Sequence, residues 1–472
     1  MTLKFSKCFA LICVTLFVSG CATPYVPPKP IQDVSDISKT QTTPDFYHAS
    51  GSALPFEEAW WVSFEDPILT TLIKEALNEN KQLEIAEANI EIARSGLNRA
   101  ELEKSYDFNS NAGLPTDRNA RFGQEAATSF VGGLSARWEW DAFGRIASAI
   151  KASELSVDAA EEARQDVAVT VASETALAYL DLRGAQSRLE VAQDNANIQS
   201  KSLSLLNDLL DNGRATQLDV SRAEAQYRTT LGSLPQFQAT IDSALNRLAV
   251  LTGISASLEN QDIRMLGVEN SDIPELKNTL LTGSPDGMIR RRPDIRQAET
   301  EIARRLALSE VERARLFPTL SFDGNLLAVF NSDNRIDRLS SFGFNFGPAL
   351  VWEGPDLRRV RADIALSDAQ TKQAYAVYEQ TVLQALSDVE TALSNAKNEV
   401  QRRDDLIKAA EASRTALELA QLRFDEGLDD FLDVLEAQRT LLENEDRLTQ
   451  SRLETTRLAI LTYRELGGVT PL

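Results

Sequence analysis

Few residues of this sequence are of the types that carry out chemistry. It has 472 residues, of which one is a histidine and three are cysteines. The histidine, His48, lies alone in a proline-rich stretch, and no glycine-rich loop that would cradle a phosphate is present. Acidic residues are abundant but scattered along helical patterns, as on solvated helix faces. The sequence therefore predicts no enzyme, no catalytic residues, no metal site and no cofactor, and it leaves the cysteines to be explained.

Cys21 is the predicted site of a covalent modification. Cys8 and Cys13 fall within residues 1–20, where two lysines precede an apolar run, as in a signal peptide. Val18-Ser19-Gly20-Cys21 resembles a bacterial lipobox, in which the cysteine is diacylated and becomes the new N-terminus. Such acyl chains contribute about 0.8 kcal/mol per buried methylene, so we expect a firm lipid anchor on Cys21. An ordinary cleavage site nearby, or an uncleaved helix, is the alternative, although the run is short for a membrane span.

The segment after the anchor differs from the rest of the chain. Residues 21–58 contain six prolines among polar residues, which predicts an extended N-terminal arm. Beyond it the composition is that of a chain able to bury a large core. The net charge of −21 argues against nucleic acid as a partner.

Two parts of the chain are similar at a constant shift of 214 residues. The shift places Gly213 on Gly427 and Asp219 on Asp433, and it also places Trp138 on Trp352. We interpret this as an internal tandem repeat. Its predicted boundaries are 59–253 for the first repeat, 254–289 for an equatorial linker, 290–466 for the second repeat and 467–472 for a C-terminal tail. Each repeat is predicted to hold a helix, a β-hairpin and a long helical hairpin.

The β-hairpins are predicted from alternating apolar and polar residues. Four such stretches of about ten residues occur, starting near Tyr106, Phe130, Leu320 and Phe342. Half-buried strands of soluble sheets alternate too, but the length and the tryptophans at the strand ends favour membrane strands. Four strands cannot close, and lipid does not tolerate free sheet edges. Pairing with other copies is therefore expected, and a trimer would supply twelve strands.

Long helices are predicted around the strands. The first runs from Pro67 to about Lys104, and a long run without proline follows each β-hairpin. The first run has a sustained heptad seam, and the second starts the same pattern before it drifts. A helix over 142–211 would be roughly 105 Å long. Gly213 and Gly427 are predicted to end the long helices in the left-handed conformation and to form the hairpin tips. A generic coiled-coil stalk would explain the heptads equally well.

The sequence from Trp60 to about Leu466 resembles the TolC-like outer membrane factor family, in its lipoprotein branch serving tripartite (RND-type) efflux systems. The stretches that carry the resemblance are WWVSFEDPILTTLIKEALNEN, WEWDAFGR, NRLAVLTG, RRRPDIRQAETEIA and RFDEGLDDFLDVLEAQRTLL. The resemblance implies a homotrimer with a twelve-stranded transmembrane β-barrel continuous with a helical tunnel. It also implies a periplasmic membrane-fusion adaptor and an inner-membrane RND-type pump as partners. Ala22, in place of Asp, implies sorting to the outer membrane of a Gram-negative bacterium.

The resemblance also implies roles for residues at the tips. Asp433 and Glu436 match positions where the family narrows its tunnel with an acidic ring, and Asp219 is the equivalent of Asp433 in the first repeat. Acidic residues in the first turns of a helix are also explained by the helix dipole alone. Gly213 and Gly427 would offer the tips for adaptor docking. Some relatives lock the tip with an aromatic hydroxyl and a basic residue, which here are Phe424 and Asp429, so that lock does not carry over.

The predicted function is an outer membrane channel lipoprotein, a passive exit duct for drugs or other small molecules. Two alternatives stay open: a duct for polypeptide secretion, and a lipid-anchored periplasmic coiled-coil adaptor without a pore. The four alternating strands, which an adaptor does not need, favour a duct. The lipobox and the RRRPDIR motif favour small-molecule efflux by resemblance.

Overall fold

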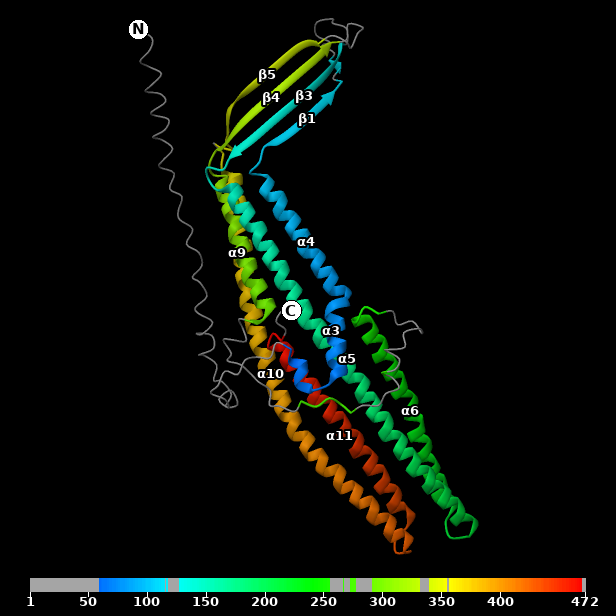
Figure 1. Ribbon diagram of the computed structural model, residues 1–472. Helices are drawn as coiled ribbons and strands as arrows, with labels where there is room; N and C mark the ends of the chain where they lie inside the picture. The colour runs from blue at the N-terminus through cyan, green and yellow to red at the C-terminus, as the bar shows by residue number, and fades with distance from the viewer. Residues whose placement is uncertain are drawn as a thin grey trace, which may run out of the picture. The chain divides into compact units, whose positions relative to one another are not determined.

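The computed structural model describes residues 59–114, 116–117, 127–254, 266, 272–276, 291–331, 339–354 and 356–468. Figure 1 shows long helices with a small sheet at the ends of α4, α5, α9 and α10. Cys21 and His48 lie outside the described residues, as do most of the predicted linker and the last four residues. Among the described helices, none combines the length and the apolar character that crossing a membrane would require.

The elements follow one another in a recurring order. The first series is α3 (Pro67–Glu79), α4 (Lys81–Leu102), β1 (Asp107–Gly113), β3 (Ala127–Trp140), α5 (Arg145–Asp211) and α6 (Gln217–Leu251). The second series is α9 (Pro293–Ala314), β4 (Thr319–Asn331), β5 (Leu339–Val351), α10 (Arg358–Asp425) and α11 (Phe431–Glu465). Two short elements are added, the 3₁₀ helix η2 (Trp60–Phe64) and the strand β2 (Thr116–Asp117). Helix, strand and long-helix positions thus match the sequence prediction, with one exception.

The exception is the first helix, which was predicted as continuous from Pro67 to about Lys104. The helix is interrupted at Asn80, whose backbone is extended at φ −67° and ψ 129°. The Asn80 amide caps α4 by accepting from the Gln82 N–H, and it donates to the Leu251 carbonyl oxygen at 2.8 Å. The apolar pattern runs through the break because α3 and α4 both pack on α5, so it could not mark the position. The buried asparagine thereby ties the break to the end of α6.

The strands form one antiparallel sheet in the order β1-β3-β4-β5. Each predicted hairpin is present, as β1 with β3 and as β4 with β5, and β3 pairs with β4 over residues 129–140 to join them. β2 adds two further pairs to β3. Within this chain β1 and β5 are the outer strands, so each has one edge without a neighbouring strand among the described residues.

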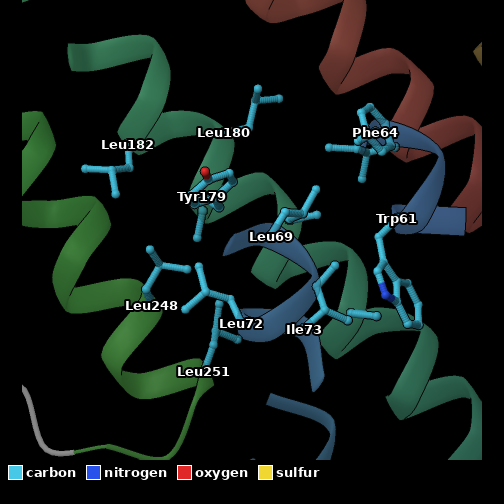
Figure 2. Packing of buried hydrophobic residues seen from close by; sticks show 14 of the residues in the cluster. Trp61, Phe64, Leu69, Leu72, Ile73, Tyr179, Leu180, Leu182, Leu248 and Leu251 are labelled. Atoms are coloured by element: carbon cyan, nitrogen blue, oxygen red, sulfur yellow. The ribbon is translucent and has the colours of Figure 1, made fainter. Parts of the chain in front are cut away.

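The core lies where η2 and α3 pack against α5 and α6. Figure 2 shows Leu69, Leu72 and Ile73 facing α5, with Leu72 beside Leu248 and Leu251 at the end of α6. Trp60 is fully buried and stacks on Tyr463 of α11 with ring centroids 5.6 Å apart. Aromatic pairs of this kind contribute about 0.5–1.5 kcal/mol beyond area burial. The core therefore holds helices of both series together at mid-length.

A buried polar chain crosses this core. The Tyr179 hydroxyl donates to Asp66 at 2.8 Å and accepts from Nε of the fully buried Arg183 at 3.0 Å. Arg183 also donates to Gln186, whose amide reaches the Leu266 carbonyl oxygen at 2.8 Å. Burial raises the pKa of Tyr179, so the hydroxyl remains a donor at neutral pH. These hydrogen bonds connect the start of α3 and α5 to Leu266, a residue of the predicted linker.

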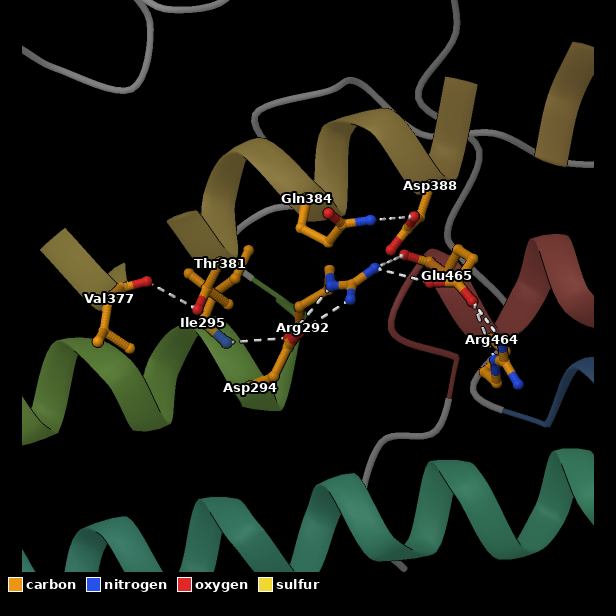
Figure 3. Close-up of polar contacts among 9 residues, drawn as sticks. All are labelled: Arg292, Asp294, Ile295, Val377, Thr381, Gln384, Asp388, Arg464 and Glu465. Atoms are coloured by element: carbon orange, nitrogen blue, oxygen red, sulfur yellow. Dashed lines mark hydrogen bonds and ion pairs between the residues drawn. The ribbon is translucent and has the colours of Figure 1, made fainter. Parts of the chain in front are cut away.

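The RRRPDIR motif joins the start of α9 to the end of α11. Arg292 donates to both carboxylate oxygens of Asp294 and to the carbonyl and carboxylate oxygens of Glu465 (Figure 3). Burial opposes the charge of Arg292, but the hydrogen bonds to Asp294 and Glu465 outweigh it and raise its pKa. Pro293 is the first residue of α9, as predicted. Arg296 adds an ion pair to Glu162 of α5 at 2.7 Å, so the motif is a three-way structural junction.

Candidate functional site

Both helical hairpins turn through the same backbone arrangement at their tips. Gly213 and Gly427 have φ of +70° and +72°, and each donates its N–H to the carbonyl three residues back. The next N–H in each tip closes a longer loop, from Arg214 to Leu209 and from Leu428 to Arg423. This is a Schellman motif. A Cβ at either glycine would meet no atom within 4 Å, so the backbone conformation, rather than space, requires glycine there. The left-handed conformation predicted for both glycines is confirmed.

The two helical hairpins pack on each other near their tips through one apolar cluster, called the tip cluster here. Its residues come from α5, α6, α10 and α11, and its buried members are Leu206, Val220, Ala223, Leu417, Phe431, Val434 and Leu441. Phe424 packs edge-on against Phe431 with ring centroids 5.1 Å apart. The phenyl ring that cannot serve as a hydroxyl lock thus holds the end of α10 against the start of α11.

An ion pair crosses the second tip. Arg423 contacts both carboxylate oxygens of Asp429, one of them at 2.8 Å through Nη2. The hydrogen bond from Arg423 lowers the pKa of Asp429, and Asp433 and Glu426 add to the field that raises the pKa of Arg423. Sequence reasoning missed this pair, because residues six apart meet only when a tight turn lies between them. Asp429 therefore has a defined role within its own tip.

Asp219 and Asp433 are each the third residue of a helix, α6 and α11. Asp219 forms a capping box with Thr216: its carboxylate accepts from the Thr216 N–H at 3.1 Å and hydroxyl at 2.6 Å, and its own N–H donates back. These hydrogen bonds lower the pKa of Asp219. The capping contacts account for Asp219 without a channel, and they add to the helix dipole that the sequence analysis gave as the alternative.

Glu436 lies beside a basic residue. Arg439, one helical turn further on, donates to its carboxylate at 2.6 Å, and this hydrogen bond lowers the pKa of Glu436. The shift of 214 residues aligns Glu436 with Arg222, whose charge also lowers the pKa of Asp219. Each predicted ring residue thus has an arginine nearby. The sequence already showed that a basic residue, Arg222, stands at the position equivalent to Glu436, but the prediction of an acidic ring did not take it into account.

Large apolar side chains are exposed around both tips. Leu218 and its equivalent Leu432 are more than half exposed, and Leu428 lies on the second turn itself at 63%. Leu205 and Leu419, further back on α5 and α10, are another exposed pair at the same shift. Exposed leucines at equivalent positions near both tips form an apolar surface that is able to bind another protein.

Other predicted sites fall elsewhere or outside the described part of the chain. The lipidation site Cys21 is not among the described residues. Within the ranges that are described, no group of three or more His, Cys, Asp or Glu side chains is arranged to hold a metal ion.

Comparison with known proteins places this geometry in a known context. The family model described as "Outer membrane efflux protein" matches residues 72–254 and 285–464. Among curated relatives, outer membrane protein OprJ of Pseudomonas aeruginosa is 29% identical over 86% of this chain and 86% of its own length. The pyoverdine export outer membrane protein OpmQ of Pseudomonas putida is 27% identical over 99% and 98%. The solved outer-membrane channel OprN is 33% identical, with a TM-score of 0.81 over 91% of this chain and 98% of that chain.

Gly427→Val is expected to loosen the second tip. A β-branched residue at φ +72° costs about 1–2 kcal/mol, so protection of the amides around 423–431 against hydrogen exchange should fall roughly tenfold. Gly96→Val is the matched control, because Gly96 lies in open space within α4 and has no positive φ. Unchanged exchange at the tip in Gly427→Val would count against the assigned turn.

Asp429→Asn is expected to loosen the same tip in a pH-dependent way. Because folding depresses the pKa of Asp429, its ion pair stabilises the tip above the ordinary Asp pKa of about 3.9, and the stabilisation is lost as the pH falls through the depressed value. At pH 7 the variant should exchange tip amides faster than the wild type, and the ratio of the two rates should approach one at strongly acidic pH. The exposed Asp425→Asn is the control. A rate ratio independent of pH would contradict the role of the pair.

Proposed function

The chain belongs to the outer membrane efflux protein family, and from this premise we propose that it is the exit duct of a tripartite efflux system. It is an outer membrane protein of the efflux transport class. In the proposal, a periplasmic membrane-fusion adaptor and an inner-membrane RND-type pump deliver drugs or other small molecules to it. The chain then conducts them passively to the exterior.

The observation that carries the proposal is the open four-stranded sheet with one strongly apolar face. Phe108, Phe344 and Phe346 are 75–81% exposed on that face, and Leu134 and Phe342 are more than half exposed beside them. A monomer in water rarely exposes so large an apolar surface, whereas a membrane strand presents one to lipid. Backbone groups at the edges of β1 and β5 must then find partners, because lipid offers none. We propose that three copies close a twelve-stranded barrel, edge to edge.

We further propose that the chain is a tandem repeat. The recurring element order supports it, and so do two contacts: Trp138 donates its indole N–H to the Lys104 carbonyl and Trp352 donates to Leu316. The copies have diverged, because Glu139 binds Arg145 whereas its equivalent Glu353 binds Arg315. In this proposal the domains are the arm 21–58, the repeats 59–253 and 290–466, the linker 254–289 and the tail 467–472.

The tips are proposed as the docking end of the duct. The turns at Gly213 and Gly427 and the exposed Leu218, Leu428 and Leu432 offer an adaptor a compact apolar surface. Asp433, Glu436 and Asp219 are proposed to line the aperture, with Arg222 and Arg439 moderating their charge. An aperture of mixed charge should prefer cations less strongly than a purely acidic ring.

The duct is tested by recording purified protein in planar bilayers after confirming a heat-modifiable trimer on gels. Conducting channels are expected, and Asp433→Asn with Glu436→Gln should lower cation preference and block by multivalent cations without affecting assembly. Arg222→Gln is the matched variant and should raise cation preference, because it removes a positive charge at the equivalent position. A protein that never conducts would favour the adaptor without a pore. If the double substitution leaves the ion preference unchanged, Asp433 and Glu436 do not line the aperture and have only a structural role.

The lipid anchor is tested on Cys21. Mass spectrometry of the mature protein should show a diacylated, N-terminal Cys21, and Cys21→Ser should abolish acylation. Because the proposed barrel also holds the membrane, the variant is expected to insert, only more slowly. An unmodified Cys21 in the wild-type protein would refute the anchor.

A further inference from the structure

The polar face of the sheet carries side chains that line up in rows across all four strands. Residues paired across antiparallel strands lie on the same face, so the register identifies each row. One row, called the charged row here, consists of Asp107, Arg137, Asp323 and Gly347. The next row on the same face, called the amide row, consists of Asn109, Ser135, Asn325 and Asn345.

The charged row has one carboxylate more than it has cations. Nε of Arg137 lies 3.6 Å from the Asp323 carboxylate, which Ser321 also contacts at 3.3 Å. Asp107 accepts from the Asn109 amide at 3.1 Å. Both Arg137 and Asp323 retain contact with solvent, at 51% and 34% exposure. Two carboxylates therefore face one guanidinium, and Gly347 adds no charge. Glu139, further along the same face of β3, is neutralised by Arg145.

Open space lies beside the amide row. A hollow of about 490 Å³ is lined by the amide row and Asn111, and also by the apolar residues Leu134, Leu326, Leu327 and Phe344. Gly133 makes room for Asn111, because a Cβ there would lie 2.5 Å from the Asn111 side-chain oxygen. At Gly343, on the same level of β5, a Cβ would meet nothing within 4 Å. Small residues thus keep this part of the face open.

The two faces of the sheet have opposite character. Phe108, Phe344 and Phe346 are exposed on the other face, whereas Leu327 and Val351 are the exposed large apolar residues on the polar one. In a membrane barrel the apolar face meets lipid and the polar face lines the lumen. The rows would then face the lumen at the membrane end of the duct, about 100 Å of helix away from the tips.

We propose that the charged row forms a second selectivity element, which favours cationic solutes inside the barrel, and that the amide row beside it offers these solutes an uncharged polar path. The inference rests on the proposed trimeric duct. Three copies would bring three unbalanced carboxylates to one level, and charges within about 8 Å of a solute act on it at physiological salt. The amides both donate and accept hydrogen bonds, so they replace a solute's water without regard to its charge. Preference at this level comes from the charged row alone.

The test measures reversal potentials of the assembled protein in planar bilayers across a potassium chloride gradient. Asp107→Asn should lower the potassium-to-chloride permeability ratio about twofold, and Arg137→Gln should raise it by a similar factor. The double variant Asp107→Asn/Asn109→Asp moves the charge about 7 Å along the same face, and it should restore the wild-type ratio. Restoration separates the charge itself from any local contact of Asp107.

The outcomes separate this inference from the function on which it rests. If the wild-type protein forms channels and the potassium-to-chloride permeability ratio is the same in Asp107→Asn and in Arg137→Gln as in the wild type, the second selectivity element is refuted but the duct is not. A wild-type protein that forms no channels overturns both. If Asp107→Asn fails to form the heat-modifiable trimer, Arg137→Gln and the double variant are decisive. A raised permeability ratio in Arg137→Gln, or a wild-type ratio in the double variant, supports the proposal.

Discussion

The pairing of backbone groups at the sheet edges is the constraint on which the proposed assembly depends. β1 and β5 have partners on one side only within the chain, and a membrane provides none for the other side. Pairing with further copies would give these edge groups hydrogen-bond partners. It would also fix the positions of the long helices, because only a short connection separates the end of β3 at Trp140 from the start of α5 at Arg145. In the same way β5 leads into α10 after six residues. Barrel closure and the spacing of the long helices are therefore one requirement.

Helices of this length also need support between their ends. α5 and α10 have 67 and 68 residues, or roughly 100 Å each, and two contacts near mid-length tie α5 and the start of α9 to α11. One is the core in which Trp60 stacks on Tyr463, and the other is the junction of Arg292 with Glu465. The tip cluster then joins the two hairpins at their far ends. Each end of the duct is thus held by its own contacts, which allows charge at the barrel and at the tips to be varied separately.

The sequence was informative wherever a period or a backbone constraint decided the structure. Alternation identified the strands, heptads identified α5 and α10, and positive φ explained Gly213 and Gly427. The break at Asn80 was missed because both flanking helices bury the same stripe. Partners of exposed charges were missed for a different reason: Arg423 meets Asp429 across a turn, and Glu353 pairs with Arg315 although its equivalent Glu139 pairs with Arg145. Such choices depend on distances that only the folded chain sets.

Hydrogen exchange at the outer edges of β1 and β5 tests the closure most directly. In an antiparallel edge strand every second amide lacks a partner, so these amides exchange quickly unless another chain pairs with them. For the protein assembled in lipid nanodiscs, closure predicts that the outward amides of both strands are protected as strongly as those of β3 and β4. Fast exchange at alternate amides of β1 and β5, beside slow exchange in β3 and β4, would contradict closure.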